Sequence, residues 1–443
     1  MNDKNKLGTS THHSSFTTHN SLVPKLRFPE FREAGEWNEK PLGKICDVLN
    51  NCRKPITSSN RVSGPYPYYG ASGIVDYVND FIFDGRLLLI GEDGAKWGAY
   101  EKTAFIVAGK YWVNNHAHVL KPFGVNDTLL ENYLTMLDLG PFITGAAPPK
   151  LTLGKLKEVP VPVPSLLGEQ QKIADCFASI DELITLEAQK LDTLKTHKKG
   201  LMQQLFPAEG ETLPRLRFPE FRTAREWIEC DFYDLLEDVL DFRGRTPLKL
   251  GMDWGGGSII SLSANNVKNG YIDFDAECNL GSEALYEKWM GKVNLEKGDI
   301  VFTMEAPLGN ALLVPDSRRY ILSQRVVAFK TKKDISSEFL IQLIWSPEFQ
   351  NEMERLSTGS TAKGINQKTL KNVSVRVPSE ENEQQKIADG LSSIDELITA
   401  QTQKLDTLKA HKRGLMQQLF PSFGGVDDET ERGGHPVGDE AQG

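Results

Sequence analysis

Hydrophobic residues recur at alternating intervals of four and three along residues 169–207, which is the spacing of a coiled-coil seam. The same spacing returns along residues 383–421. Aligned at a constant offset of 214, the two stretches are identical at 31 of 39 positions. Proline stands only before each stretch and at its end, so nothing interrupts a helix. The pattern predicts two long helices that pair as an antiparallel coiled coil.

Ten seam positions recur in each copy, and eight of them are hydrophobic in both. The hydrophobic positions are Ile173, Phe177, Ile180, Ile184, Leu191, Leu194, Leu201 and Leu205 in the first copy, and Ile387, Leu391, Ile394, Ile398, Leu405, Leu408, Leu415 and Leu419 in the second. The other two are polar in both copies: Glu187 matches Gln401, and Lys198 matches Lys412. Polar seam residues lower stability but can fix the register and orientation of paired helices.

A second repeat lies upstream of each helix. Residues 24–37, with the sequence PKLRFPEFREAGEW, return as PRLRFPEFRTAREW at 214–227, an offset of 190. From Thr144 onward the offset is already 214, so the extra 24 residues of the second half lie between this arm and that point. The ends of the two halves therefore match, while their middles differ. We interpret the aromatic residues of the arm as a hydrophobic clip that anchors the start of each domain.

The middle regions have the pattern of mixed α/β domains. Each holds three short β-rich runs, then a helix, a Thr-Gly loop and a short alternating strand. The β-rich runs are 86–92, 103–109 and 117–123 in the first half, and 298–304, 310–316 and 325–331 in the second. The helices are expected at Asp127–Leu137 and Ser336–Trp345, and the final strands at 159–164 and 373–378. The predicted fold class is α+β: two mixed α/β domains, two long antiparallel helices, and an internal pseudo-two-fold.

These patterns predict an order of segments along the chain. The segments are a disordered tail (1–23), a first α/β domain (24–168), a first helix (169–207), a second α/β domain (208–382), a second helix (383–421) and a disordered acidic tail (422–443).

Charge does not mark either domain as a nucleic-acid binder, because the chain carries a net charge of −9. The residues of the acidic tail contribute −5, residues 24–168 sum to +1, and residues 208–382 sum to −5. Any contact with DNA must therefore come from local basic loops. The chain contains no apolar run near the roughly 20 residues of a membrane span, and no apolar signal core. We expect a cytoplasmic protein without membrane contact.

No motif indicates catalysis or a bound cofactor. The chain lacks the [DNS]-P-P-[YFW] motif of amino methylation, and "APPK" at 147–150 has neither the acid or amide nor the aromatic residue. No G-x-x-x-x-G-K-[ST] phosphate loop occurs, and we interpret "GEDGAKWG" at 91–98 as a turn. The five cysteines include no C-x-x-C pair, which disfavours a zinc site or a disulfide framework. No cofactor and no metal are expected.

Several stretches together resemble the specificity subunits of type I restriction-modification systems. They are "VPVPSLLGEQQKIADCFASIDELI" and its second copy "VRVPSEENEQQKIADGLSSIDELI", the "LMQQLFP" endings, "YPYYGASGIVDYVNDFIFDGRLLLIGEDG", and "KGDIVFTMEAPLGNALLV" followed by "SQRVVAF". The resemblance covers nearly all of residues 24–421. It implies a subunit that is not catalytic by itself, whose two target-recognition domains each bind one half of an asymmetric bipartite site in double-stranded DNA.

The resemblance also implies partners. The paired helices would set the spacing between the half-sites and dock two methyltransferase subunits. The complex would be an N6-adenine methyltransferase and, with restriction/motor subunits, an ATP-dependent endonuclease. The alternative is a coiled-coil scaffold that presents two adaptor domains to proteins and binds no DNA. The acidic net charge slightly favours this alternative, whereas differing middles between matched ends disfavour it.

Candidate DNA contacts follow from side-chain chemistry. Arg suits guanine, Asn and Gln suit adenine, and Lys, Arg and small hydroxyls suit phosphate. The candidates in the first domain are Arg53, Lys54, Tyr68, Tyr69, Ser72, Lys96, Trp97, Asn114, Asn115, His116 and Lys150. Those in the second are Arg243, Arg245, Asn265, Asn266, Lys268, Gln324, Arg325, Ser360, Thr361, Lys363 and Asn366.

Each candidate also has a structural explanation. The two tyrosines could belong to the core, Asn265 and Asn266 could stabilise a turn, and Arg325 could pair with an acid. The loop "TGSTAKGINQ" at 358–367 is the favoured DNA-contacting segment, because glycine, hydroxyls, Lys and Asn coincide there. The matching loop "TGAAPPKLTL" at 144–153 has lost most of these groups, which fits two domains that read different sequences.

Overall fold

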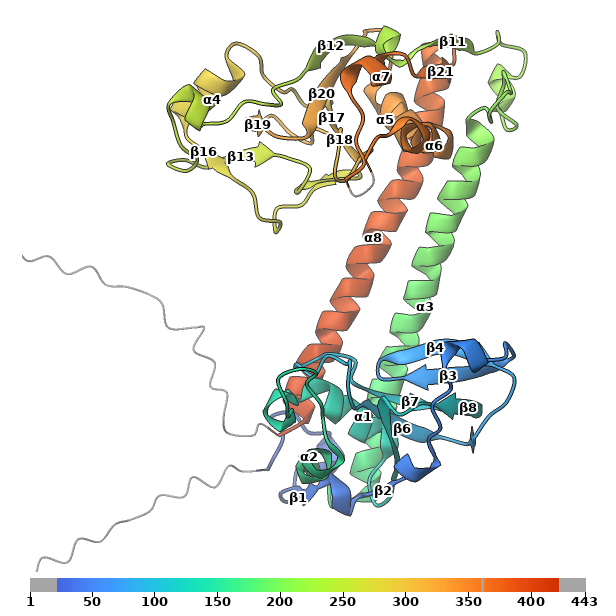
Figure 1. Ribbon diagram of the computed structural model, residues 1–443, viewed down its shortest axis with the longest axis vertical. Coiled ribbons are helices and arrows are strands. Elements are labelled where there is room, and N and C mark those ends of the chain that lie inside the picture. Colours follow the sequence, from blue (N-terminus) through green and yellow to red (C-terminus); the bar gives the residue numbers. More distant parts are fainter. Residues whose placement is uncertain (1–21, 360–361, 422–443) are drawn as a thin grey trace, which may run out of the picture. The chain divides into compact units, whose positions relative to one another are not determined.

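The structure is a computed structural model that describes residues 22–359 and 362–421, and these divide into two compact units. Unit 1 combines the chain up to Glu187 with the chain from Lys404 onward, and unit 2 is Ala188–Gln403. Each unit contains one mixed α/β domain and a segment of each long helix (Figure 1). The predicted tails, 1–23 and 422–443, lie outside the described residues except for Leu22 and Val23.

Both long helices form as the repeat predicts. Helix α3 spans Leu167–Leu205 and helix α8 spans Glu381–Leu419, so their ends are also offset by 214 residues. None of the predicted seam residues is exposed, whereas most of the positions between them are. Amphipathic helices of this length are stabilised by burying that seam rather than by intrinsic propensity.

The lysines at the polar seam positions pair with aspartates of the other helix. Within unit 1, Lys412 Nζ lies 2.6 and 2.8 Å from the carboxylate oxygens of Asp181, and Lys404 pairs with Glu187. From the first pair to the second, the residue number rises on α3 and falls on α8, so the helix segments of unit 1 are antiparallel. Within unit 2, Lys198 Nζ lies 2.7 and 2.8 Å from the carboxylate oxygens of Asp395. The two lysine–aspartate pairs are copies of each other at the repeat offset.

The α/β domain of unit 1 is built on two four-stranded sheets. One sheet has the order β2 (Cys46–Val48), β9 (Ala117–Pro122), β6 (Leu87–Gly91), β7 (Ala104–Val107), and its pairs are antiparallel. The other has the order β4 (Gly73–Val78), β3 (Tyr66–Gly70), β8 (Lys110–Val113), β5 (Phe83–Asp84), with β3 and β8 parallel. Strand β1 (Asn38–Pro41) pairs with β10 (Pro160–Val163), and the helices are α1 (Asp127–Met136) and α2 (Leu153–Glu158).

Unit 2 repeats this plan. Its four-stranded antiparallel sheet has the order β12 (Leu236–Leu240), β20 (Val326–Thr331), β17 (Ile300–Thr303), β18 (Ala311–Leu313). A second sheet has the order β16 (Leu280–Gly281), β13 (Ile259–Leu262), β19 (Tyr320–Leu322), with β13 and β19 parallel. Strand β11 (Ile228–Asp231) pairs with β21 (Ser374–Val377), and β14 (Val267–Lys268) with β15 (Tyr271–Ile272). The helices are α4 (Glu283–Met290), α5 (Ser337–Trp345), α6 (Pro347–Leu356) and α7 (Gln367–Lys371).

The predicted strands, domain helices and mixed fold class are confirmed. The strand pairings also show where most of the 24 extra residues of the second half are inserted. Tyr69 of β3 and Leu262 of β13 each lie beside the last residue of their parallel neighbour, and they are 193 residues apart. Gly91 of β6 and Thr303 of β17 pair with the first residues of β9 and β20, and they are 212 apart. The insertion between these points includes α4, whose Trp289 is buried in the core of unit 2.

A buried carboxylate ties the start of each long helix to the arm of its own unit. Arg27 donates to both oxygens of Glu169 at 2.7 Å, and Trp37 Nε1 donates to the same carboxylate at 3.2 Å. In unit 2, Arg217 donates to both oxygens of Glu383 at 2.7 Å, and Trp227 Nε1 donates at 3.3 Å. We call each group of three the arm clamp. Both carboxylates lie in the first turn of a helix, where the helix dipole also favours negative charge.

The residue after each clamp glutamate joins the helix to two other elements. Gln170 accepts from the backbone nitrogen of Asn126, the N-cap of α1, and donates to the carbonyl of Pro164 after β10. Gln384 accepts from the backbone nitrogen of Ser336, the N-cap of α5. The repeated Glu-Gln sequence therefore binds the helix start to the arm, the strand end and the domain helix.

In each unit, the phenylalanine that follows the other long helix packs against the tryptophan of the arm. In unit 1, the ring of Phe420, which follows α8, stacks on Phe177 of α3 at 5.7 Å and meets Trp37 edge-on at 6.3 Å. In unit 2, Phe206, which follows α3, lies 6.2 Å from Trp227 and 5.8 Å from Phe339. The arm does act as a hydrophobic clip through its tryptophan, as predicted. Its arginine has a role in the clamp that the repeat alone did not indicate.

We expect the substitution Glu383→Ala to destabilise the protein by about 3–5 kcal/mol, because it leaves the buried guanidinium of Arg217 without its carboxylate partner. Urea-induced unfolding of the full chain, followed by circular dichroism, measures the loss. Glu381→Ala is the matched control: it removes an exposed glutamate from the same helical turn. We expect the control to lose less than about 1 kcal/mol. Equal losses for the two variants would contradict the role of the clamp.

Candidate nucleic-acid interface

One corner of the main sheet has the same backbone arrangement in both units. In unit 1 the Thr-Gly loop closes on itself, because Thr144 and Lys150 exchange two backbone hydrogen bonds of 2.8 Å, and Leu151 then bonds to the carbonyl of Glu92 just after β6. In unit 2, Thr358 and Gly364 exchange bonds of 2.9 and 3.0 Å, and Ile365 bonds to the carbonyl of Met304 just after β17. We call this place the strand-end corner. It brings together the end of β6 or β17, the residue before β9 or β20, and the Thr-Gly loop.

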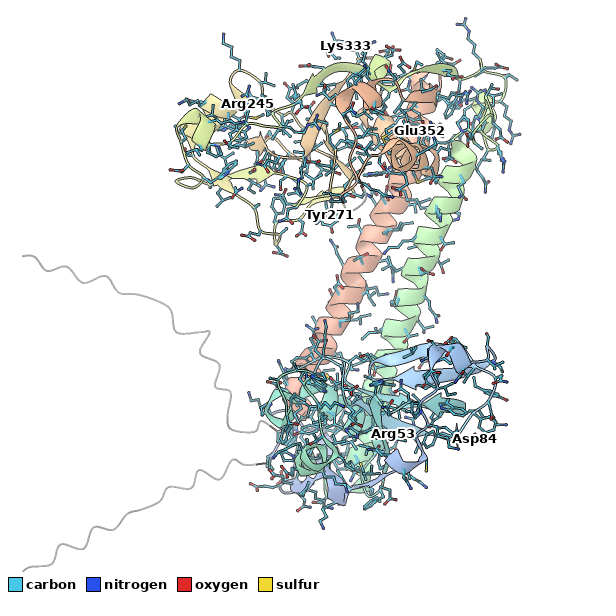
Figure 2. The ribbon with its side chains drawn as sticks, viewed as in Figure 1. Arg53, Asp84, Arg245, Tyr271, Lys333 and Glu352 are labelled. Atoms are coloured by element: carbon cyan, nitrogen blue, oxygen red, sulfur yellow. The ribbon has the colours of Figure 1, made fainter. Side chains whose placement is uncertain are left out.

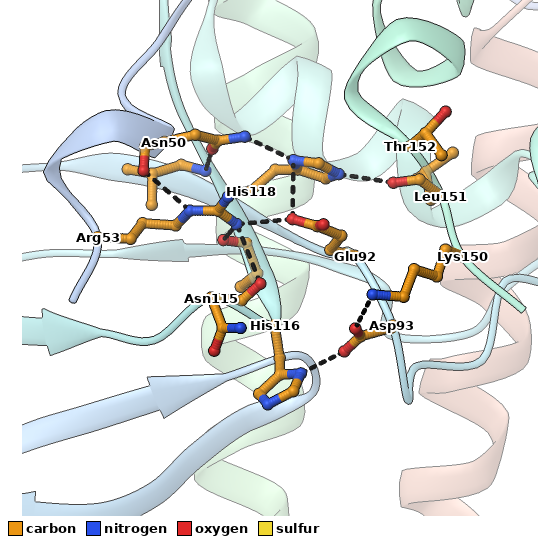
Figure 3. Close-up of polar contacts among 12 residues, drawn as sticks. Asn50, Arg53, Glu92, Asp93, Asn115, His116, His118, Lys150, Leu151 and Thr152 are labelled. Atoms are coloured by element: carbon orange, nitrogen blue, oxygen red, sulfur yellow. Dashed lines mark hydrogen bonds and ion pairs between the residues drawn. The ribbon is translucent and has the colours of Figure 1, made fainter. Parts of the chain in front are cut away.

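In unit 1 the corner carries a carboxylate between two basic side chains (Figure 3). Asp93 contacts Nδ1 of His116, and its other oxygen lies 3.0 Å from Nζ of Lys150. Partial burial raises the pKa of Asp93, but the hydrogen bonds from His116 and Lys150 outweigh that effect and hold the pKa below its ordinary value. Asp93 therefore stays ionised and orients two side chains that are themselves about half exposed.

A buried network lies under this group and holds its backbone. Arg53 donates to Glu92 at 2.7 Å, and also to the carbonyls of Ala117 at 2.8 Å and Asn115 at 3.2 Å. The ring of His118 bonds through Nε2 to the carbonyl of Leu151 at 2.7 Å and through Nδ1 to Asn50 at 2.8 Å (Figure 3). Arg53 was predicted to contact DNA, but its guanidinium is largely buried and its bonds fix the turn that presents His116.

In unit 2 the same corner carries Glu305 and Arg325. Glu305 is two residues beyond Thr303, and Arg325 immediately precedes β20, so they correspond to Asp93 and His116. Arg325 Nε lies 3.4 Å from Glu305 Oε1, and both side chains are about half exposed. The backbone of Arg325 has φ = 68°, a left-handed conformation that is uncommon for residues other than glycine. Its carbonyl accepts a hydrogen bond of 2.8 Å from Met304, which holds it in place.

Arg325 also lines a polar pocket of about 460 Å³ in unit 2. Three more predicted DNA contacts line this pocket: Arg245, Asn265 and Gln324. Arg245 lies beside α4 (Figure 2). Its guanidinium donates to the carbonyl of Trp289 and stacks over the ring of Phe242, 4.6 Å from the ring centroid. Asn265 donates to the carbonyl of Glu277 at 2.6 Å. The fold therefore gathers four candidates from three separate loops.

Three candidates are buried, so their side chains are not available to DNA. Tyr68 is 1% exposed, and its hydroxyl accepts a hydrogen bond from the backbone of Ile56. Asn114 is buried and accepts from the backbone of His116, and Asn266 is fully buried and bridges Ser261 and Ser263. These placements correspond to the core and turn explanations, and we leave the three residues out of the interface.

Other candidates have mainly structural contacts. Arg243 is half-buried against Asp241 at 2.6 Å. Trp97 donates to the carbonyl of Gly91, Tyr69 packs edge-on against Tyr111, Lys268 bonds to the carbonyl of Asn265, and Asn366 caps α7. Lys363 is exposed and pairs with Glu354. The exposed candidates Lys54, Ser72, Lys96 and Asn115 lie on loops. Ser360 and Thr361, in the favoured loop, lie outside the described residues.

The sequence analysis missed the carboxylates of both corners. Glu92, Asp93 and Glu305 were not proposed, because acidic side chains are not expected to face DNA phosphates. A signal was present: an acid follows the first β-rich run in both halves, in "IGED" and in "FTME". Within the described residues, no group of His, Cys, Asp or Glu could hold a metal ion, and no helix is long and apolar enough to cross a membrane.

The comparisons with known proteins agree with the duplicated architecture. A family model described as the type I restriction modification DNA specificity domain matches residues 34–196 and 235–410. A putative type I restriction enzyme specificity subunit of Haemophilus influenzae is 40% identical over 33% of this chain and 39% of its own length. A type I restriction enzyme specificity subunit of Methanocaldococcus jannaschii is 23% identical over 89% of this chain and 93% of its own.

A solved structure supports the fold. The S subunit of a type I restriction-modification system from M. genitalium superimposes with a TM-score of 0.60 at 14% identity, and the match covers 91% of this chain and 100% of that one.

The corner of unit 1 generates a pH prediction. Burial lowers the pKa of His118 below its ordinary value, so the unfolded chain binds the proton first as the pH falls. Stability should therefore fall below about pH 6.5, with a slope from this residue of at most about 1.4 kcal/mol per pH unit. Urea unfolding between about pH 7 and about pH 5.5 measures the slope.

The variant His118→Gln retains a donor for the carbonyl of Leu151 but cannot titrate, so its stability should change less with pH than that of the parent. An equal pH dependence in the variant and the parent would exclude His118 as the cause.

Proposed function

Because the chain belongs to the type I restriction-modification DNA specificity family, we propose that it is the DNA-reading subunit of a type I complex. In this proposal each α/β domain binds one half of an asymmetric bipartite site in double-stranded DNA. The paired helices set the distance between the half-sites and dock methyltransferase subunits. The subunit has no chemistry of its own, and its action on DNA would place it in the cytoplasm.

The observation that carries this proposal is the pair of strand-end corners. Both are held by the same backbone hydrogen bonds, yet one presents Asp93, His116 and Lys150 while the other presents Glu305 and Arg325. A scaffold that needed two like adaptors would retain like side chains at matched positions. Base-edge recognition requires different side chains for different bases, so the arrangement supports two readers with different targets.

The helices support the proposed role as a spacer. The pairs Lys412–Asp181 and Lys198–Asp395 recur at the repeat offset, and each is made inside one unit. A lysine in a mostly hydrophobic seam has its partner only in one register, so these pairs favour a single length of overlap. A fixed overlap is what a spacer between two half-sites requires.

The reader role predicts a change in the methylation of host DNA. Deleting the gene in a host that expresses the partner methyltransferase should abolish adenine methylation at one split, asymmetric motif, because the methyltransferase loses its target reader. Methylation mapping across the genome measures this, and complementation with the intact gene should restore the motif. Unchanged methylation in a strain with proven methyltransferase expression would overturn the proposal.

Binding should depend strongly on salt. We expect the purified chain with its methyltransferase subunits to bind the mapped site, with an affinity that falls by about ten-fold or more between about 50 and about 200 mM salt, because phosphate contacts release counterions. Fluorescence anisotropy with a labelled duplex measures this, and a scrambled duplex is the control. A complex that binds neither duplex would favour the coiled-coil scaffold.

A further inference from the structure

In the strand-end corner of unit 2, the guanidinium of Arg325 lies beside a carboxylate at its Nε atom only. Glu305 lies 3.4 Å from Nε of Arg325, and among the described residues the two terminal nitrogens have no hydrogen-bond partner. The side chain is 51% exposed. A carboxylate beside the Nε edge leaves the two terminal nitrogens, whose N–H bonds lie in the plane of the guanidinium, to donate as a pair.

In each of the other two arginine candidates of this domain, a terminal nitrogen already donates a hydrogen bond within the protein. Arg243 directs Nε and one terminal nitrogen at Asp241, whose carboxylate also accepts from Gln367 at 2.5 Å. Arg245 donates a terminal nitrogen to the carbonyl of Trp289. Of the three arginines proposed as DNA contacts in unit 2, only Arg325 is both exposed and unbonded at its terminal nitrogens.

The backbone of Arg325 indicates a functional constraint. Its φ of 68° is strained for a residue with a β-carbon, and the equivalent residue in unit 1, His116, is not among the residues of positive φ. The strain is maintained by the hydrogen bond from Met304 to the carbonyl of Arg325. A glycine would adopt this conformation without strain, so the arginine found here is consistent with a role for its side chain.

We propose that Arg325, aligned by Glu305, reads a guanine in the half-site that unit 2 binds, by donating from both terminal nitrogens to O6 and N7. Glu305 is a positioning residue, and it prevents the guanidinium from turning toward a phosphate. The equivalent reading position in unit 1 is His116, aligned by Asp93. This inference rests on the proposed function and assigns one residue of the interface to one type of base.

The test compares variants of the chain in its complex with the methyltransferase subunits. For Arg325→Ala, we expect discrimination at one G·C pair of one half-site to fall by about 10- to 100-fold, while the other half-site is read as before. Arg325→Lys retains the charge but not the paired donors, so it should lose the same discrimination. Glu305→Gln should lose part of it.

The readout is the methylated motif in host DNA, together with binding of the purified complex to duplexes in which that half-site is randomised. Binding is measured as well because a variant could lose methylation altogether. Arg319→Ala is the matched control, since Arg319 is also 51% exposed and paired with a glutamate but precedes β19 instead of following it. The control should read the parent motif.

The outcomes separate the inference from the proposed function. If the parent chain specifies a split motif and Arg325→Ala leaves every position within about two-fold of the parent, the inference is wrong and the function stands. If Arg325→Ala weakens binding equally for all sequences and Arg325→Lys restores it, Arg325 contacts a phosphate, which also overturns the inference. If the parent specifies no motif, the proposed function fails, and the inference fails with it.

Discussion

Each unit depends on a buried carboxylate that accepts hydrogen bonds from two side chains of the arm. Glu169 and Glu383 are each about 1% exposed, and an ionised group at that depth is tolerated only when its oxygens are fully bonded. The arginine and tryptophan of the arm supply those bonds. Because the carboxylate belongs to the first turn of a long helix, the clamp fixes where that helix leaves its domain. The neighbouring glutamine then ties the same turn to the N-cap of the domain helix.

The strand-end corners show how one backbone design accommodates two chemistries. The hydrogen bonds that shape each corner are made by main-chain groups, so they do not constrain the exposed side chains. In both corners a carboxylate lies against a basic side chain. In unit 1 the acid is less exposed than the two basic side chains that it contacts, whereas Glu305 and Arg325 are both about half exposed.

Side-chain chemistry suggested candidate DNA contacts but did not predict the accessibility of each residue. Asn114 and Asn266 have the amides that suit adenine, yet both are buried and bond to the backbone of a turn. Arg53 was also proposed as a DNA contact, and its guanidinium bonds to the turn that presents His116. The same functional groups serve both purposes, because an amide or guanidinium that can bond a base edge can equally bond a carbonyl. Only the packing of distant segments decides between them.

Local and periodic features of this protein follow from the sequence alone: the two long helices with their seams, the β-rich runs and the domain helix that recur in each half, and the duplication. They depend on interactions between near neighbours or on a regular pattern of burial, and both are written into the order of residues. The partners of Glu169 and Glu383, the pairing of the seam lysines with aspartates, and the meeting of Glu305 with Arg325 depend on tertiary structure. These contacts join residues far apart in the chain, and their distances are set by how the elements pack.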